Sequence, residues 1–248
     1  MAKPFSKTQI DRLGDRLKKG DISEADLRLL DEYRRSFAQA FGFIVEAIRR
    51  ELALELTERA EKSTTSIVEK LKRESIRLTQ IQDIAGCRLI VPDIANQEAV
   101  VQSLKNLFER TTIIDRRQKP SHGYRAVHVV VSCLDKIVEI QVRTLLQQLW
   151  AELSERLSDV LDPAIKYGGG DDWFQKALIH ISDVVAEEEL YEMELVKSAL
   201  SSSKGFRVET TPSLGDPNET LVSKKQEILE KLQEAINVVS KYSIKDSE

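Results

Sequence analysis

The chain has 248 residues, a formal net charge of −4, a pI of about 5.6, and hydrophobic and charged contents of 41% and 31%. This composition is typical of a globular protein, and its acidic balance argues against a general nucleic-acid coat, which would be basic overall. No stretch approaches the ~18 consecutive apolar residues of a membrane span, and the N-terminus lacks the apolar core of a signal peptide. We therefore expect a cytoplasmic protein with no membrane partner.

The first part of the chain, residues 6–60, is predicted to be helical. Ile10, Leu13 and Leu17 recur at helical spacing, and Ser23 is placed to cap a second helix. From Leu27 to Leu56, apolar residues continue at intervals of three or four, which predicts a long helix that faces the core.

Residues 62–75 begin with hydroxyl side chains and continue with Lys70, Lys72 and Arg73, the pattern of a capped and charged helix. The free N–H groups at a helix N-terminus attract phosphate, although an ordinary surface helix has the same pattern.

Residues 82–91 predict a strand that is led by Asp83 and Gly86 and contains Arg88. An arginine inside a strand usually has an anionic partner. Residues 95–109 fit an amphipathic helix, and residues 111–114 fit a short strand.

The stretch from Asp115 to Thr144 predicts a basic loop followed by a β-hairpin, with strands at 128–132 and 137–142. In the second strand Glu139, Gln141 and Arg143 fall at period two and so share one face. A solvated sheet face has the same pattern. The loop beside it favours a binding site, because its cations suit phosphates and Tyr124 offers an aromatic face.

Residues 145–161, 173–200 and 219–242 predict three more helices, and the Ser/Thr/Pro/Gly-rich stretch 201–218 predicts a linker. We expect N-terminal helices over 1–39, a central domain over 40–165 and a helical extension over 171–248. Because strands and helices alternate in the middle of the chain, the fold class is predicted to be α/β or α+β, with a mixed sheet of about five strands flanked by helices.

Cys87 and Cys133 each lie in a predicted strand and are interpreted as buried apolar residues, and no CxxC or HExxH motif suggests zinc.

Four segments of the chain resemble the synthetase domain of RelA/SpoT-type enzymes, in the order and approximate spacing of that family. They cover about residues 40–165 and are Lys62-x-x-x-Ser66-Ile67-x-x-Lys70-Leu71, Asp83-Ile84-Ala85-Gly86-x-Arg88, Pro120-x-x-Gly123-Tyr124-Arg125-x-x-His128 and Glu139-Ile140-Gln141-Val142-Arg143-Thr144. The resemblance implies a nucleotidyltransferase-like fold and a small alarmone synthetase. Without the family's His-Asp dyad, its hydrolase activity is not expected.

Enzymes of this family are GTP pyrophosphokinases. With Mg²⁺ they transfer the pyrophosphate of ATP to the 3′-hydroxyl of GDP or GTP, which makes (p)ppGpp alarmones. Carried over position by position, the resemblance gives each matching residue an expected role. Catalysis and Mg²⁺ binding would fall to Asp83 and Glu139, ATP binding to Lys62, Ser66, Lys70 and Arg88, and acceptor binding to Lys119, Tyr124, His128, Gln141 and Arg143.

Two alternatives stay open at this point. The acceptor could instead be the 3′ end of tRNA or an adenine nucleotide, with Arg116, Arg117, Lys119 and Arg125 along an RNA backbone. The chain could also be a non-catalytic module that senses nucleotides. The sequence leaves open the oligomeric state, including a homo-oligomer, and any allosteric ligand or neutralising partner.

Overall fold

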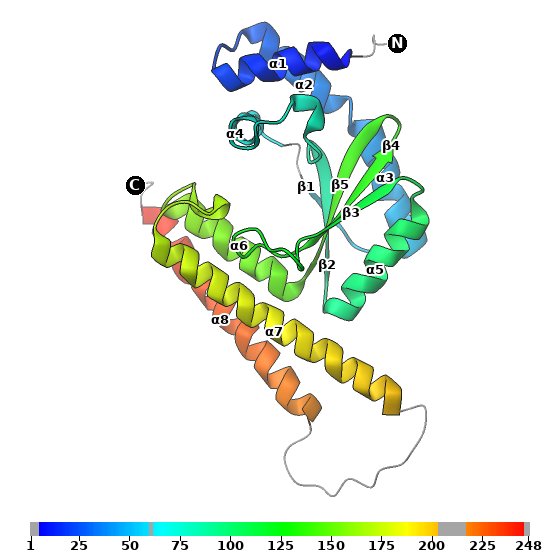
Figure 1. Ribbon diagram of the computed structural model, residues 1–248, viewed down its shortest axis with the longest axis vertical. Helices are drawn as coiled ribbons and strands as arrows, with labels where there is room; N and C mark the ends of the chain where they lie inside the picture. Colours follow the sequence, from blue (N-terminus) through cyan, green and yellow to red (C-terminus); the bar gives the residue numbers. More distant parts are fainter. Residues whose placement is uncertain (1–4, 60–61, 203–216, 246–248) are drawn as a thin grey trace, which may run out of the picture. The chain divides into compact units, whose positions relative to one another are not determined.

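A computed structural model describes residues 5–59, 62–202 and 217–245 (Figure 1). Its helices are α1 (Lys7–Lys19), α2 (Glu24–Arg35), α3 (Ala38–Leu52), α4 (Thr64–Glu74), α5 (Ile94–Leu107), α6 (Leu145–Val160), α7 (Asp172–Ser202) and α8 (Pro217–Lys245), with short 3₁₀ turns η1 (Leu78–Gln80) and η2 (Ile165–Tyr167). Its strands are β1 (Thr57–Arg59), β2 (Ala85–Val91), β3 (Thr111–Asp115), β4 (Val127–Cys133) and β5 (Lys136–Thr144).

The chain divides into two compact units, each assembled from separate segments. Unit 1 contains Met1–Leu89, Gln102–Ile114 and His128–Gln141, and unit 2 contains Ile90–Val101, Asp115–Val127 and Val142–Glu248.

The N-terminal helices of unit 1 form as their sequence predicts. The hydroxyl of Ser23 accepts a hydrogen bond from the backbone N–H of Asp26, and the Asp26 carboxylate accepts one from the backbone N–H of Ser23. This capping box satisfies two of the free N–H groups at the start of α2. The Arg16 side chain of α1 donates to the same Asp26 carboxylate, with Nη2 at 2.6 Å from the oxygen, and so joins the two helices.

The long helix predicted between Leu27 and Leu56 is wrong in two places. A turn at Ser36 and Phe37 separates α2 from α3, and the Ser36 hydroxyl donates to the Tyr33 carbonyl, which competes with the helical hydrogen bonds. After α3, Ala53 adopts a left-handed conformation with φ of 50°, and residues 57–59 form strand β1. Pairing with β2 satisfies the backbone there and overrides the local helical pattern.

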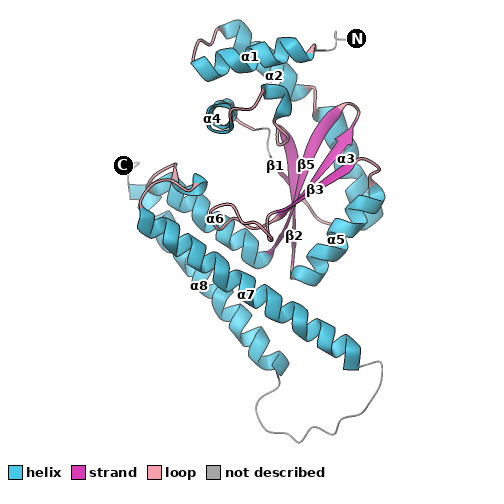
Figure 2. Cartoon of the chain, in the orientation of Figure 1, coloured by secondary structure: helices cyan, strands magenta, loops and turns pink. Residues whose placement is uncertain are grey.

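One five-stranded sheet has the strand order β1-β2-β5-β4-β3. Its strands are coloured magenta in Figure 2. The predicted α+β class and the sheet of about five strands are therefore confirmed. Strands β4 and β5 form the predicted hairpin, and Leu134 and Asp135 between them both have positive φ, of 48° and 57°. Two such residues are typical of the tight turn whose twist matches its strands.

Unit 2 is built around an apolar cluster of α6, α7 and α8. Buried Trp150 and Leu153 of α6 pack with Leu178 of α7 and with Leu232 and Ile236 of α8. Helices α7 and α8 are the long neighbours drawn in yellow and orange in Figure 1. Most of the linker predicted near 201–218 lies outside the described residues. No helix in the described part of the chain is long and apolar enough to cross a membrane.

Candidate active site

Asp83 of unit 1 is neutralised by two lysines that the sequence predicted for phosphate binding. Lys62 Nζ lies 2.7 Å from one carboxylate oxygen of Asp83, and Lys70 Nζ lies 2.9 Å from the other. All three side chains are largely buried, with exposed fractions of 9%, 19% and 10% for Lys62, Lys70 and Asp83. Lys70 also lies 4.0 Å from a carboxylate oxygen of Glu74, so its charge is shared between two carboxylates.

The pKa of Asp83 reflects this pairing. Burial raises the pKa of Asp83, but the charges and hydrogen bonds of Lys62 and Lys70 lower it by more. The pKa of Asp83 therefore lies well below the usual range for an aspartate. Asp83 is therefore ionised at neutral pH.

Glu139 of unit 1 lies in β5 and is held by hydrogen bonds to both carboxylate oxygens. His128 Nδ1 lies 2.8 Å from Oε1, and the Gln141 amide donates to Oε2 over 2.8 Å. The polar face of β5 is not solvated, since Glu139, Gln141 and Arg143 are only 7%, 8% and 4% exposed. This face of β5 is therefore not a solvated sheet face, and each of the three side chains has a polar partner.

Gly86 gives a physical reason for the glycine in the predicted Asp83 motif. A Cβ atom at this position would lie 2.6 Å from the carbonyl oxygen of Glu139, closer than any real Cβ contact. Only glycine allows β2 to approach β5 this closely beside the Glu139 side chain.

The electrostatics of Glu139 suit a carboxylate that stays charged. Burial and the charge of Asp83 raise the pKa of Glu139, while His128 and Gln141 lower it by hydrogen bonding and charge, and the net pKa lies below the ordinary value. No group of three or more His, Cys, Asp or Glu side chains suited to a metal occurs among the described residues.

The other two residues predicted to bind ATP, Ser66 and Arg88, lie in α4 and β2 of unit 1. The backbone N–H of Ser66 donates to the hydroxyl of Ser63, which caps α4, so the predicted capped helix is confirmed. Arg88 is half-buried in β2 and pairs across the ladder with Thr57 of β1.

The basic loop predicted after Asp115, residues 115–126, is called the acceptor loop below; it belongs to unit 2 and is closed by a tight turn. The N–H of Tyr124 donates to the carbonyl of Ser121 over 2.9 Å, and the two residues between them, His122 and Gly123, both have positive φ, of 52° and 86°. A Cβ on Gly123 would lie 2.7 Å from the Trp150 ring of α6. Glycine is required there by the conformation and by the close packing.

Tyr124 and Arg143 form a pair in unit 2. Arg143 Nη2 donates to the Tyr124 hydroxyl over 3.0 Å, and the guanidinium lies 5.2 Å from the centre of the ring. The ring of Trp150 is 6.4 Å away at 54°. Tyr124 is half-buried, because Arg143 and the helices of unit 2 pack against it.

The prediction that all the cations of this loop face a ligand is wrong. Arg117 is bound internally, with Nη2 2.6 Å from Asp115 and 2.8 Å from Glu98. Arg125 is largely buried near Glu189 of α7. Arg116 and Lys119 are exposed. The basic surface available to a phosphate backbone from this loop is therefore about half of what the sequence suggested.

The polar residues that hold this loop were missed from the sequence. Gln97 of α5, Gln147 of α6 and Glu189 of α7 are buried and joined by hydrogen bonds. One local signal was available: Thr144 and Gln147 have the spacing of a capping box, and they form one at the start of α6.

The family model described as "Region found in RelA / SpoT proteins" matches residues 59–158. Protein Rv1366 of Mycobacterium tuberculosis is 33% identical over 171 residues, which cover 66% of this chain and 63% of that protein. The GTP pyrophosphokinase YjbM of Bacillus subtilis is 34% identical over 114 residues, 39% of this chain and 53% of that protein. The chain thus spans less than two thirds of these relatives.

Among solved structures, small alarmone synthetase 1 of Bacillus subtilis bound to its product pppGpp has the same fold, with a TM-score of 0.53. The sequence identity is 24%, and the match covers 73% of this chain and all of the other.

Proposed function

Because residues 59–158 match the model of the region found in RelA / SpoT proteins, we propose that this chain is a member of that family and transfers the pyrophosphate of ATP to the 3′-hydroxyl of a guanine nucleotide. In this reaction the hydroxyl oxygen forms a bond to the β-phosphorus of ATP, the bond between that phosphorus and the oxygen bridging to the α-phosphate breaks, and AMP leaves. The reaction needs positioning and charge neutralisation more than a covalent nucleophile.

The buried Glu139 is the observation that carries the proposal. Its two oxygens are fixed by His128 and Gln141, and it remains charged, so it is suited to accept the proton of the acceptor hydroxyl. A purely structural glutamate at this depth would be costly to bury.

Lys62 and Lys70 are proposed to bind the phosphates of ATP. Both now neutralise Asp83, and their ammonium groups have the charge that the triphosphate requires. Arg88 is proposed to stack on the adenine and Ser66 to bind phosphate at the start of α4, as the family resemblance implies.

Asp83 and Glu139 are proposed to hold Mg²⁺, and the chemistry of their side chains supports this. The pKa values of Asp83 and Glu139 both lie below their ordinary values, so both carboxylates are ionised at neutral pH, and Mg²⁺ is usually bound by one or two carboxylates with water and substrate phosphates in its other positions. When bound, the ion would neutralise charge on the transferred phosphates.

Tyr124 is proposed to stack on the acceptor base, with Arg143 holding the ring from its hydroxyl and its face. Lys119 is exposed and is proposed to pair with acceptor phosphates. The contacts of two loop cations favour a free nucleotide over a polymer as the acceptor, because the internal binding of Arg117 and the burial of Arg125 remove two of the four cations that an RNA backbone would contact.

An assay with labelled ATP tests the proposal. The protein is incubated with Mg²⁺ and, separately, with GDP, GTP, AMP, ATP or tRNA, and the products are separated by chromatography. We expect a labelled guanine nucleotide and AMP. Label on tRNA or on an adenine nucleotide would instead identify a different acceptor, and no transfer to any of them would favour a module that only binds nucleotides.

Glu139→Gln is expected to lower the turnover by about 100-fold or more, because the amide cannot accept the proton and is a poor ligand for Mg²⁺. Since the amide oxygen can still accept from His128, the fold should persist, which circular dichroism and thermal unfolding would verify. The exposed Glu109 provides the control Glu109→Gln, whose turnover should equal that of the wild type. Near-normal turnover of a folded Glu139→Gln protein contradicts the assignment.

A further inference from the structure

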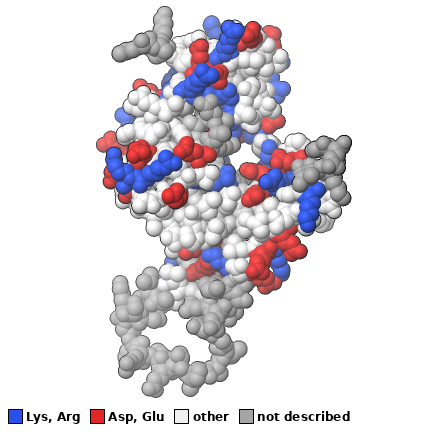
Figure 3. All heavy atoms as spheres, turned by 180° about the vertical axis from the view of Figure 1, so that it is seen from behind, with Lys and Arg blue, Asp and Glu red and all other residues white. Residues whose placement is uncertain are grey.

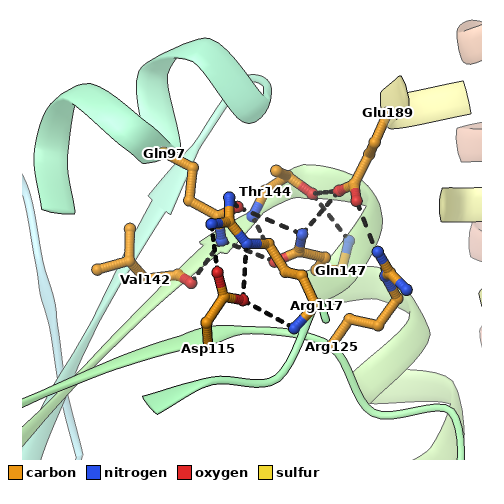
Figure 4. Close-up of polar contacts among 8 residues, drawn as sticks. All are labelled: Gln97, Asp115, Arg117, Arg125, Val142, Thr144, Gln147 and Glu189. Atoms are coloured by element: carbon orange, nitrogen blue, oxygen red, sulfur yellow. Dashed lines mark hydrogen bonds and ion pairs between the residues drawn. The ribbon is translucent and has the colours of Figure 1, made fainter. Parts of the chain in front are cut away.

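A buried network in unit 2 joins helices α5, α6 and α7 (Figure 4). At its centre Glu189 Oε1 accepts from the Thr144 hydroxyl over 2.6 Å and from the Gln147 amide over 2.8 Å. Gln97 in turn donates to Gln147 over 2.8 Å and to the carbonyl of Val142 over 2.7 Å. Each partner is buried, so these hydrogen bonds fix the end of β5 and the start of α6 in one geometry.

The same network reaches the acceptor loop at two points. Arg117 donates to Gln97 over 3.1 Å while it pairs with Asp115 at the start of the loop. Arg125, at the other end of the loop, lies 4.0 Å from Glu189 Oε2. Both ends of the segment that contains Tyr124 are thus attached to the network (Figure 4).

Tyr124 and Arg143 both adjoin residues of this network in the chain. Arg143 precedes Thr144, and Tyr124 precedes Arg125. The loop also rests on α7, because a Cβ on Gly123 would lie 3.2 Å from the carbonyl of Leu178. A shift of Glu189 would therefore move the backbone next to Tyr124, through Arg125, and the backbone next to Arg143, through Thr144.

Glu189 is hard to account for by stability alone. It is 2% exposed, and burial raises its pKa even though Thr144, Gln147, Arg125 and Arg117 oppose this effect by hydrogen bonds or charge. Within the described chain Oε2 has no hydrogen bond. A carboxylate that is buried with incomplete compensation usually costs stability.

We propose that Glu189 of α7 is a positioning residue for the acceptor site: through Thr144, Gln147 and Arg125 it holds the loop and the Tyr124–Arg143 pair in the geometry that receives the acceptor base. The nature of the ligand rests on the proposed function, while the positioning of the loop does not. Because α7 lies outside residues 59–158, the helical extension becomes a part of the site and not an appendage to it.

The test compares Glu189→Ala with Glu189→Gln in the full chain. We expect Glu189→Ala to raise the KM for the acceptor by about ten-fold, the factor that corresponds to losing a hydrogen bond to a charged group, with the KM for ATP unchanged. Glu189→Gln keeps an oxygen for Thr144 and Gln147 and should recover part of the acceptor affinity. Hydrogen exchange should show faster amide exchange over 115–126 in Glu189→Ala without any ligand.

The neighbouring Glu188 supplies the matched control. It is fully buried on the same helix, but its ion pair, at 3.3 Å, is with Lys224 of α8. Glu188→Ala should change neither the acceptor KM nor exchange over 115–126, whatever it does to thermal stability.

Each outcome separates the two proposals. Faster loop exchange in Glu189→Ala together with a wild type that uses no guanine nucleotide would overturn the proposed function and support the positioning role. An active wild type with unchanged acceptor KM and unchanged loop exchange in Glu189→Ala would overturn the positioning role. If Glu189→Ala does not fold, Glu189→Gln is tested in its place, because it removes only the charge. If its loop exchange and its acceptor KM are both unchanged, the proposed role of the Glu189–Arg125 pair is overturned.

Discussion

At the scale of single residues, the unit 1 site is dominated by a carboxylate that carries two cations. Asp83 has one lysine on each oxygen, and all three groups are largely shielded from water. Removing one partner of a buried ion pair is strongly destabilising, because the remaining charge is left without compensation. Asp83 thus has a measurable structural role besides the proposed role in binding Mg²⁺.

Asp83→Asn is expected to lower the free energy of unfolding by roughly 3 kcal/mol at pH 7. The pKa of Asp83 is lowered from its ordinary value of 3.8 in the folded protein, so its contribution is fully present above that value and is lost as the pH falls below it. The difference between wild type and variant should therefore narrow from pH 6 to pH 3. Urea unfolding at several pH values would measure it.

Asp15→Asn is the matched control for this series, since Asp15 is an exposed carboxylate of unit 1. Its stability should follow that of the wild type across the same pH range. A difference between wild type and Asp83→Asn that stays constant down to pH 3 would contradict the lowered pKa of Asp83.

At the scale of elements, the close approach of β2 and β5 determines where Glu139 lies. The backbone oxygen of Glu139 occupies the space that a side chain at position 86 would need. Since this neighbour is backbone and not the end of a flexible side chain, the strands would have to separate to make room. The glycine of the Asp83 motif therefore serves the geometry of the opposite strand.

Gly86→Ala is expected to cost roughly 1–3 kcal/mol of stability, the usual range for overpacking, and to lower turnover, because Glu139 would shift. Gly42→Ala is the matched control. Position 42 lies within α3 with no atom within 4 Å of the added Cβ, so this change should stabilise the protein by up to about 1 kcal/mol. Thermal unfolding of both variants tests this, and an unchanged Tm for Gly86→Ala would contradict the close packing.

At the scale of the whole molecule, the charge distribution bears on the type of acceptor. The chain carries 37 basic and 41 acidic residues, and on the face drawn in Figure 3 the described charges of both signs are interspersed. A polymer backbone is bound by many phosphate contacts at once, which requires a continuous basic surface. Stacking on one aromatic ring needs no such surface.

Tyr124→Ala is expected to raise the acceptor KM by about 5- to 150-fold, the range that corresponds to roughly 1–3 kcal/mol of stacking. Tyr124→Phe keeps the ring and loses only the hydroxyl that Arg143 contacts, so its effect should be much smaller. Reversal of the exposed cations, Arg116→Glu with Lys119→Glu, should matter less than loss of the ring. A larger effect of the reversal, with activity that falls steeply with salt, would indicate an RNA acceptor.

By itself, the sequence determined the α+β class and the helices and strands with clear periodicity. It also indicated which residues are candidates for the site. Lys62, Lys70, Asp83 and Glu139 could be singled out because each belongs to one of the short motifs that resemble the RelA/SpoT family. Ser23 and the hydroxyl-rich start of residues 62–75 could be recognised as helix caps, since a cap acts on backbone groups two or three residues away.

Only the tertiary structure decided which of these side chains form ion pairs and hydrogen bonds with one another. The pairs that define the sites join distant positions: Lys62 and Asp83 are 21 residues apart, and Gln147 and Glu189 are 42 apart. Local periodicity carries no information on such pairs, so Arg117 looked like a ligand for phosphate and Glu189 like one more charge on a helix. The short strand β1 was missed for the same reason, because its hydrogen bonds come from β2 and not from its own segment.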